Sequence, residues 1–295
     1  MRAAALTGLL AMAIPAAALD WVSALGGRVE RNEKNEVTAI LLRGSWVTDV
    51  DLDGIAATPS VERIDLSNTR ITDLGLLRLK GLRNVRELNL FYAELITDEG
   101  LAALRDWPRL ERLNLRGAKV TDNTLSLLAT KKSLVALDVG FAEVTDSGMQ
   151  HLAALTALRE LHFGGNKLTE ASLQVLRALP ALEKLDISGR QRTDSGLWTI
   201  AITDLGLDPV LGLPRLRWLN LSGTPVTNKG VEKLKGMARL EVLKLIGAKR
   251  VTDEAVPHLA AMPALRWVDL KDTGVTQAGA AALRSARPGC EALLE

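Results

Sequence analysis

The stretch VERIDLSNTRITDLGLL, residues 61–77, decides the fold. In its first half apolar and polar side chains alternate, which predicts a short strand with one buried face. Its second half begins with Thr72, which can cap a helix by accepting a bond from a free backbone N–H, and Asp73, an acid that complements the helix dipole. Leucines then recur every three residues, as at Leu76 and Leu79, and form one inward helical stripe. The stretch therefore predicts one strand followed by one helix.

The same unit recurs along the chain every 24 or 25 residues, apart from one unit of 34 residues. In this register the copies start at Val37, Val61, Val85, Leu110, Leu134, Leu158, Leu182, Leu216, Leu240 and Leu265. Each copy carries a threonine at the same place: Thr48, Thr72, Thr97, Thr121, Thr145, Thr169, Thr193, Thr227, Thr252 and Thr276. A single unit cannot bury its apolar stripe, whereas stacked neighbours can. We therefore expect an α/β solenoid of about ten repeats, with parallel strands on the concave face and helices on the convex face.

Composition restricts the possible functions. The 295 residues include 55 leucines, which indicate one repeated buried slot, and the formal net charge is only +2. A chain so nearly neutral is not expected to bind nucleic acid. The single cysteine, Cys290, excludes an internal disulfide framework and a multi-cysteine metal site, and three histidines leave little for metal or acid–base chemistry. We therefore expect no cofactor, no metal and no catalytic activity.

The pattern Leu-x-x-Leu-x-Leu, a small residue and then Val-Thr-Asp-x-Gly-Leu resembles the leucine-rich repeat family over residues 37–295. Within that family it is similar to the ribonuclease-inhibitor-like and the cysteine-containing (F-box-associated) classes, in a bacterial exported form. It departs from them at the ninth position of the unit, where small residues such as Ala118 and Ala142 stand in place of the usual Asn or Cys. The resemblance implies a horseshoe-shaped, non-catalytic module that binds a protein partner through its concave face.

The N-terminus has the three parts of a secretory signal. Residues 1–18 combine a basic start at Arg2, an apolar run too short to span a bilayer, and three alanines at the end. A disordered start is the alternative. Residues 19–36 are interpreted as an N-terminal cap, a helix and a hairpin that covers the first strand's edge. We therefore expect an exported monomer, in the periplasm, at the cell surface or outside the cell, without membrane insertion.

The repeat domain, residues 37–295, contains one irregular unit. A ten-residue insertion lies near 194–207, where TDSGL at 193–197 is followed by TDLGL at 203–207. Either copy could be the in-register helix start. The insertion is either a tolerated surface turn or a protrusion that binds a partner.

The C-terminus continues the period. Cys290 follows Leu265 by 25 residues, which is where the next strand is expected to start. Residues 290–294 are therefore predicted to form a vestigial last strand. In it Cys290 is interpreted as a buried small hydrophobe, with a reactive thiol as the alternative.

Two candidate binding patches follow from the register. The outward residues of the strands form a rigid concave surface, and large aromatic residues with arginine on such a face are typical interface anchors. The first patch comprises Phe91, Tyr92, Arg116, Phe141 and His162. The second centres on Trp218 and Trp267, with Arg217 and Arg266. We predict that both patches contact a protein partner; the alternative is that some of these aromatic residues pack against one another.

Three other functions fit parts of the sequence. An enzyme would have to use His162 with Asp138 and Asp186 in the flanking strands, but no serine or cysteine elbow accompanies them. The F-box-associated resemblance implies, as an alternative, a substrate-recognition component of a ubiquitin ligase, although no F-box precedes Val37 and the signal segment argues against a cytosolic role. A structural envelope protein would self-associate and capture no specific partner.

Overall fold

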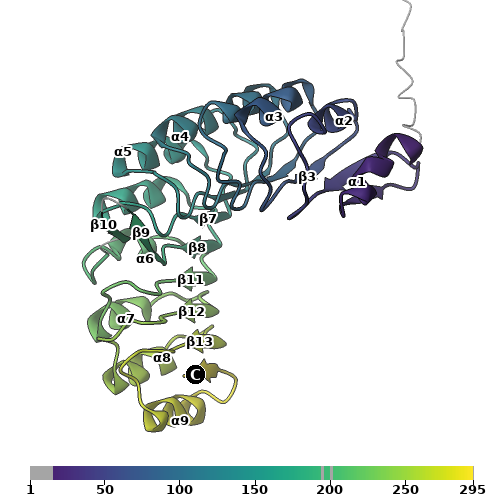
Figure 1. Cartoon of the computed structure of the whole chain (residues 1–295). Helices are drawn as coiled ribbons and strands as arrows, with labels where there is room; N and C mark the ends of the chain where they lie inside the picture. Colours follow the sequence, from purple (N-terminus) through teal and green to yellow (C-terminus); the bar gives the residue numbers. More distant parts are fainter. Residues whose placement is uncertain (1–15, 194–195, 200–201, 295) are drawn as a thin grey trace, which may run out of the picture.

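The computed structural model describes residues 16–193, 196–199 and 202–294, so most of the predicted signal segment lies outside the described residues. The chain forms an open, curved solenoid in which strands line the inner face and helices line the outer face (Figure 1). The two ends of the repeat array lie far apart, at opposite ends of the arc (Figure 1). This is the architecture that the period of the sequence predicts.

One twelve-stranded sheet lines the concave face. Its strands, in spatial order, are β1 (Arg28–Arg31), β2 (Val37–Leu41), β3 (Arg63–Asp65), β4 (Glu87–Asn89), β5 (Arg112–Asn114), β6 (Ala136–Asp138), β7 (Glu160–His162), β8 (Lys184–Asp186), β11 (Trp218–Asn220), β12 (Val242–Lys244), β13 (Trp267–Asp269) and β14 (Glu291–Leu293). From β2 onward neighbouring strands are parallel and each residue pairs with its counterpart in the next repeat, as Leu113 does with Leu137. The register therefore stacks equivalent side chains in columns.

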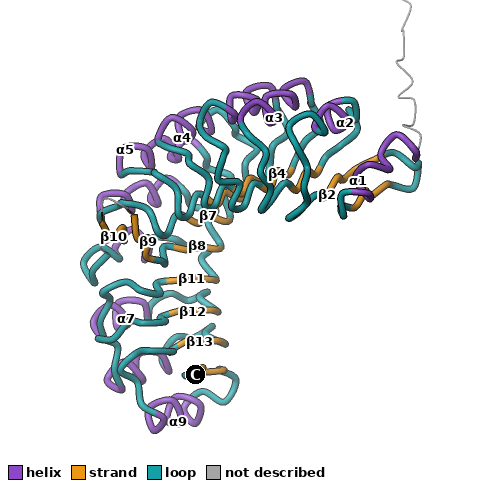
Figure 2. The backbone as a smooth tube through the Cα atoms, viewed as in Figure 1, coloured by secondary structure: helices purple, strands orange, loops and turns teal. Residues whose placement is uncertain are grey.

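Short helices cover the convex side (Figure 2). The α-helices are α1 (Asp20–Ala24), α2 (Leu52–Ala56), α3 (Asp73–Arg78), α4 (Asp122–Leu128), α5 (Asp146–Met149), α6 (Asp208–Leu211), α7 (Asn228–Leu234), α8 (Val256–Ala260) and α9 (Gln277–Ala286). The 3₁₀ segments are η1 (Ala16–Leu19), η2 (Leu79–Gly81), η3 (Gly100–Asp106), η4 (Gln150–Ala154), η5 (Glu170–Ala178) and η6 (Asp253–Ala255). Several repeats therefore replace part or all of the predicted α-helix with a tighter 3₁₀ turn.

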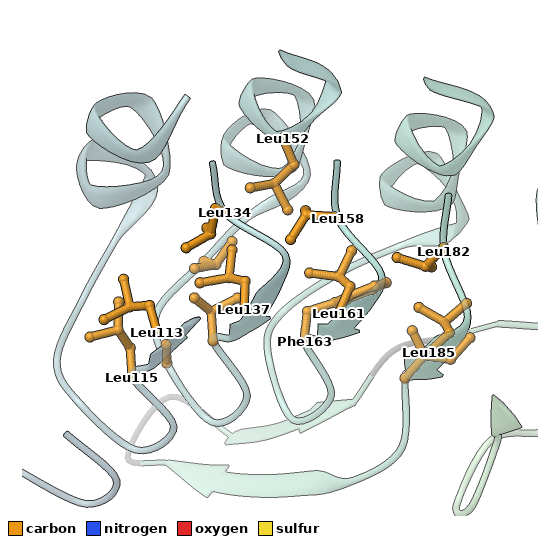
Figure 3. Close-up of a cluster of buried hydrophobic side chains, with 14 of the residues drawn as sticks. Leu113, Leu115, Leu134, Leu137, Leu152, Leu158, Leu161, Phe163, Leu182 and Leu185 are labelled. Atoms are coloured by element: carbon orange, nitrogen blue, oxygen red, sulfur yellow. The ribbon is translucent and has the colours of Figure 1, made fainter. Parts of the chain in front are cut away.

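The core lies between the two layers. The middle residue of each strand points away from the concave face, so that Leu113, Leu137, Leu161 and Leu185 form one buried column (Figure 3). The helix side closes over this column, for example through Leu152 (Figure 3). Burying one such leucine contributes about 2 kcal/mol, and the same slot is repeated along the array. This repeated burial accounts for the leucine excess of the sequence.

The threonine and the acid that recur in the repeat unit connect neighbouring repeats. Thr145, for example, caps α5 by accepting a bond from Ser147 N–H, and it also donates its own N–H and hydroxyl to the carboxylate of Asp122 in the preceding repeat. The same acid–threonine pairs are Asp49–Thr72, Asp73–Thr97, Asp98–Thr121, Asp146–Thr169, Glu170–Thr203, Asp204–Thr227 and Asp253–Thr276. We refer to this series as the acid–threonine ladder. The acid therefore joins two repeats, a role that the helix-dipole argument did not predict.

A glycine often follows the ladder acid by two positions because the preceding repeat's carboxylate occupies the space of its side chain. A Cβ atom added to Gly148 would lie 2.0 Å from Oδ1 of Asp122. Where Thr124 stands in this position, its hydroxyl instead bonds to the Asp98 carboxylate. The ladder thus explains the glycine of the repeat unit.

The insertion forms a hairpin between β8 and α6. Its strands β9 (Arg190–Thr193) and β10 (Gly196–Thr199) are antiparallel and make a separate two-stranded sheet. Thr203 bonds to Glu170 of the preceding repeat. The second copy, TDLGL at 203–207, is therefore the one in register, although α6 itself begins only at Asp208. Thr193, counted above as the repeat's threonine, belongs to the hairpin.

Both ends of the sheet carry an additional strand. At the first end β1 pairs antiparallel with β2, and at the other end β14 pairs in parallel with β13. Cys290, just before β14, is 4% exposed, and burial raises the pKa of its thiol. Within the part of the chain that the structure describes, no helix has both the length and the apolar character needed to cross a bilayer.

Candidate partner-binding surface

The concave surface consists of the outward residues of the sheet. In β5, for example, Arg112 and Asn114 are half-exposed whereas Leu113 is buried between them. A groove of about 550 Å³ follows this surface from β1 to β7 and includes His162 in its wall. The strands thus present their first and third side chains toward the open side of the arc.

Arginines in the first half of the concave surface are paired with acids. Arg63 contacts Glu30, and Arg112 Nη2 lies 2.7 Å from Oε1 of Glu160, two strands away. Next to the sheet, Arg86 makes a similar contact, its Nη1 2.7 Å from Oε1 of Glu111. This half of the surface is therefore largely neutralised by its own ion pairs.

Two predicted residues of the first patch contact Asp138, and a third, Phe141, contacts one of these two. The Arg116 guanidinium lies 4.5 Å above the Phe141 ring, and its Nη1 is 3.8 Å from Oδ2 of Asp138. Nδ1 of His162 lies 3.4 Å from the same carboxylate oxygen. Arg116, Phe141 and His162 therefore form one contiguous cluster, held by a charged group that the sequence argument had assigned to the enzyme alternative.

The two other residues of the first patch contact each other. The Phe91 and Tyr92 rings meet edge to face, with their centres 4.6 Å apart. Tyr92 is 39% exposed and lies against Gly117 of the next repeat. The Tyr92 N–H donates to the carbonyl oxygen of Arg116 at 2.7 Å, so the Phe91–Tyr92 pair is joined to the Arg116 cluster through the main chain.

Tyr92 and Phe141 lie in the turns after β4 and β6 rather than in the strands. Their φ angles are +51° and +54°, a left-handed conformation that disfavours side chains with a Cβ. Gly117 and Gly165 adopt the same conformation in neighbouring repeats, and Asn68 does so as well. The predicted patch therefore extends beyond the concave strands onto the rim of the sheet, at two positions with backbone strain.

The second patch is larger than the sequence predicted. Nζ of Lys244 lies 5.5 Å from the centre of the Trp218 ring and 5.3 Å from that of Trp267. Nζ of Lys184 lies 5.0 Å from the Trp218 ring. Sequence reasoning missed Lys184, although the register that places it beside Trp218 could have identified it.

The two patches meet at His162. Its imidazole is stacked on Trp218, with the ring centres 6.2 Å apart and the planes 12° from parallel. The contact passes over β8, which separates β7 from β11 in the sheet. A continuous set of side chains therefore crosses the concave surface; we call this the concave row. It consists of Arg116, Asp138, His162, Lys184, Trp218, Lys244 and Trp267.

The two acids in the strands that flank His162 make different contacts. Asp138 faces its Nδ1, as described, whereas Asp186 accepts hydrogen bonds from the N–H and hydroxyl of Ser188. Nε2 of His162 is buried and has no hydrogen-bond partner among the described residues. In the same part of the chain, no three histidine, cysteine or acidic side chains are grouped as metal ligands. The catalytic arrangement considered above, with both acids serving the histidine, is not the observed geometry.

Comparison with known proteins identifies the repeat. Residues 81–104 and 130–153 match the family model described as Leucine Rich repeat. The structure is similar to that of internalin C2 from Listeria monocytogenes, with a TM-score of 0.55 and 23% sequence identity over 71% of this chain and 80% of that chain. It is also similar to the internalin inlF of that organism, with a TM-score of 0.58 and 18% identity over 87% of this chain and 86% of that chain. No curated protein matches the sequence.

These similarities confirm the predicted fold class. The chain carries leucine-rich repeats, and its open, mostly parallel sheet with helices on the outer side is a leucine-rich repeat solenoid. Solenoids of this kind provide extended concave surfaces for protein interaction.

Proposed function

We propose that the chain is a non-catalytic module that binds a protein partner through its concave surface. The observation that supports this most is the continuity of the concave row, which joins aromatic, cationic and acidic side chains from β5 to β13. Aromatic residues and arginine are enriched where protein interfaces bury most of their energy. Such side chains, fixed by their neighbours, bind with little loss of conformational entropy.

The dimensions of the row suit a protein rather than a small molecule. Its side chains extend from β5 to β13, which are six strand spacings apart. At roughly 4.8 Å per spacing the row spans about 29 Å. A standard interface buries about 800 Å² on each partner, which a surface of this length can supply.

The proposed setting is outside the cytoplasm. We infer export to the periplasm, the cell surface or the extracellular space from the signal-like pattern of residues 1–18, and we propose that the protein acts as a monomer. Fusion of residues 1–18 to a reporter that is active only after export tests the location. Size-exclusion chromatography with light scattering tests the oligomeric state.

Affinity capture with the immobilised protein tests partner binding. The first variant combines Phe91→Ala, Tyr92→Ala and Phe141→Ala, and the second combines His162→Ala with Trp218→Ala. We expect each set to weaken capture of the partner by at least about tenfold, because truncation of interface anchors commonly costs more than 1 kcal/mol.

The matched control removes apolar side chains outside the concave row. Leu74 and Leu205 are 71% and 77% exposed and lie next to the starts of helices on the outer layer. Leu74→Ala combined with Leu205→Ala is expected to leave capture unchanged. Equal capture by the wild type and both concave variants, at unchanged thermal stability, would refute the proposed function.

A further inference from the structure

Two lysines of the concave row have no acidic partner. Nζ of Lys184 and of Lys244 lies near tryptophan rings, and neither ammonium group forms an ion pair with a described residue. This contrasts with the first half of the surface, where Arg63, Arg112 and Arg116 all contact carboxylates. In the part of the chain that the structure describes, the second half of the row therefore presents two ammonium groups that no carboxylate contacts as an ion pair.

The acids nearest to these lysines in the sheet are engaged elsewhere. Glu160, which is paired in register with Lys184, contacts Arg112. Asp186, two residues after Lys184, is 9% exposed and bonds to Ser188. Asp269, which is paired in register with Lys244, is 5% exposed and accepts the N–H of Lys271. An ammonium group that is left without a carboxylate on a half-buried surface favours a carboxylate from a binding partner.

The tryptophans hold the lysines in place. Lys244 lies between Trp218 and Trp267, and Trp218 lies between Lys184 and Lys244. Cation–π contacts of this kind are worth about 0.5–1 kcal/mol at exposed sites, so they restrict side chains that would otherwise be mobile. The result is a fixed alternation of cationic and apolar groups across β8, β11, β12 and β13.

We infer that this part of the concave row recognises an acidic, extended segment of the partner protein; the inference rests on the proposed function. The segment places carboxylates on Lys184 and Lys244 and an apolar side chain on Trp218. β8 and β12 are two strand spacings apart, or roughly 9.6 Å, and Lys244 stands two residues further along its strand than Val242, the register counterpart of Lys184. An extended chain presents every second side chain to one face, at intervals of roughly 6.6 Å. The matching pattern is therefore two glutamates four positions apart with an apolar residue midway between them.

Two synthetic peptides test this inference directly. Both are capped at their ends and carry a fluorescent label; one repeats the pattern Glu-Ser-Leu-Ser, which places the glutamates and leucines on one face of an extended chain, and the other replaces every glutamate with glutamine. Fluorescence anisotropy with the full chain is expected to show at least about tenfold tighter binding of the glutamate peptide, and weaker binding as salt rises. Equal affinity for the two peptides, or binding of neither, contradicts the inference.

The variants locate the site. Lys184→Gln with Lys244→Gln is expected to weaken glutamate-peptide binding by about tenfold, whereas the matched pair Lys34→Gln with Lys229→Gln, at exposed positions outside the row, leaves it unchanged. Unchanged binding by the first pair overturns the inference. So does displacement of the peptide by an equal concentration of a DNA oligonucleotide, since that indicates a general polyanion site.

The combined variant Lys184→Gln with Lys244→Gln also distinguishes failure of this inference from failure of the proposed function. If partner capture survives Lys184→Gln with Lys244→Gln but is lost in His162→Ala with Trp218→Ala, the concave surface binds a partner by other chemistry, and only the acidic segment is refuted. If capture survives both pairs and also the combined Phe91→Ala, Tyr92→Ala and Phe141→Ala variant, the proposed function fails as well.

Discussion

Asp122 accepts two hydrogen bonds from Thr145 of the next repeat. The Thr145 N–H lies 2.8 Å from Oδ1, and its hydroxyl oxygen lies 2.6 Å from Oδ2. The same hydroxyl accepts a bond from Ser147 N–H at the start of α5. One carboxylate therefore secures the start of the following helix, and repetition of this contact ties each repeat to its neighbour.

Replacing Asp122 tests the ladder. Asp122→Ala leaves the N–H and hydroxyl of Thr145 without their acceptor, so we expect it to lower the free energy of unfolding by about 1–3 kcal/mol. Asp122→Asn is the matched control, because Asn228 occupies the same position of the ladder, where it accepts the Thr252 N–H and donates its amide N–H to the Thr252 hydroxyl. Urea unfolding followed by circular dichroism measures both. Equal losses in the two variants would show that the carboxylate, rather than a polar ladder group, is required.

A substitution at Gly148 tests whether the ladder carboxylate leaves no space for a side chain at this position. In Gly148→Ala the new Cβ would meet Oδ1 of Asp122 at 2.0 Å and displace a carboxylate held by two hydrogen bonds. We expect a loss of about 1–3 kcal/mol in the free energy of unfolding, the usual range for overpacking. Gly236→Ala is the control, since nothing lies within 4 Å of its added Cβ. A neutral Gly148→Ala would disprove the steric explanation of the motif's glycine.

The carboxyl of Asp98 is expected to lose its contribution to the free energy of unfolding in acid. Burial raises the pKa of Asp98, but hydrogen bonds from Thr121 and Thr124 lower it by more, so the pKa lies below its ordinary value of 3.8. A carboxyl with a depressed folded pKa stabilises the fold above its unfolded pKa, and this contribution disappears as the pH falls through the folded pKa. The stability difference between the wild type and Asp98→Asn should therefore narrow once the pH drops below 3.8.

Chemical unfolding across a pH series measures this difference. Glu33→Gln, in the exposed turn between β1 and β2, serves as the control for general acid effects. A difference between the wild type and Asp98→Asn that stays constant into strong acid would contradict the prediction.

A substitution at Tyr92 tests whether its ring contributes to partner binding rather than to the stability of the fold. Its left-handed backbone costs roughly 1–3 kcal/mol, and Asn68 tolerates the same conformation in the preceding repeat. In Tyr92→Asn the relief of strain offsets the loss of the ring contact with Gly117, so we expect the free energy of unfolding to change by less than about 1 kcal/mol. Partner capture is expected to weaken in the same variant. A large loss of stability would instead assign the ring a structural role.

The period of the sequence determined the fold and the columns of the concave surface. Local alternation and the leucine spacing are short-range properties, because they follow from the repeats of a strand and a helix. They were sufficient to place His162, Trp218 and Trp267 on strands. They also assigned six of the threonines correctly as helix caps, namely Thr72, Thr121, Thr145, Thr169, Thr227 and Thr276, but not Thr48, Thr193 or Thr252. The helix lengths were less predictable, since packing against neighbours turned several segments into 3₁₀ helices.

The stacking of the repeats in the tertiary structure determined which side chains of the columns contact one another. Only the distance between adjacent repeats allows Asp122 to reach Thr145, and only the stacked structure shows that Thr203, not Thr193, takes the ladder position of the long repeat, whose helix α6 begins at Asp208. The stack of His162 on Trp218 depends on a side chain passing over an intervening strand. Such contacts depend on the curvature of the solenoid and on side-chain direction. Neither property is encoded in the spacing of residues along one repeat.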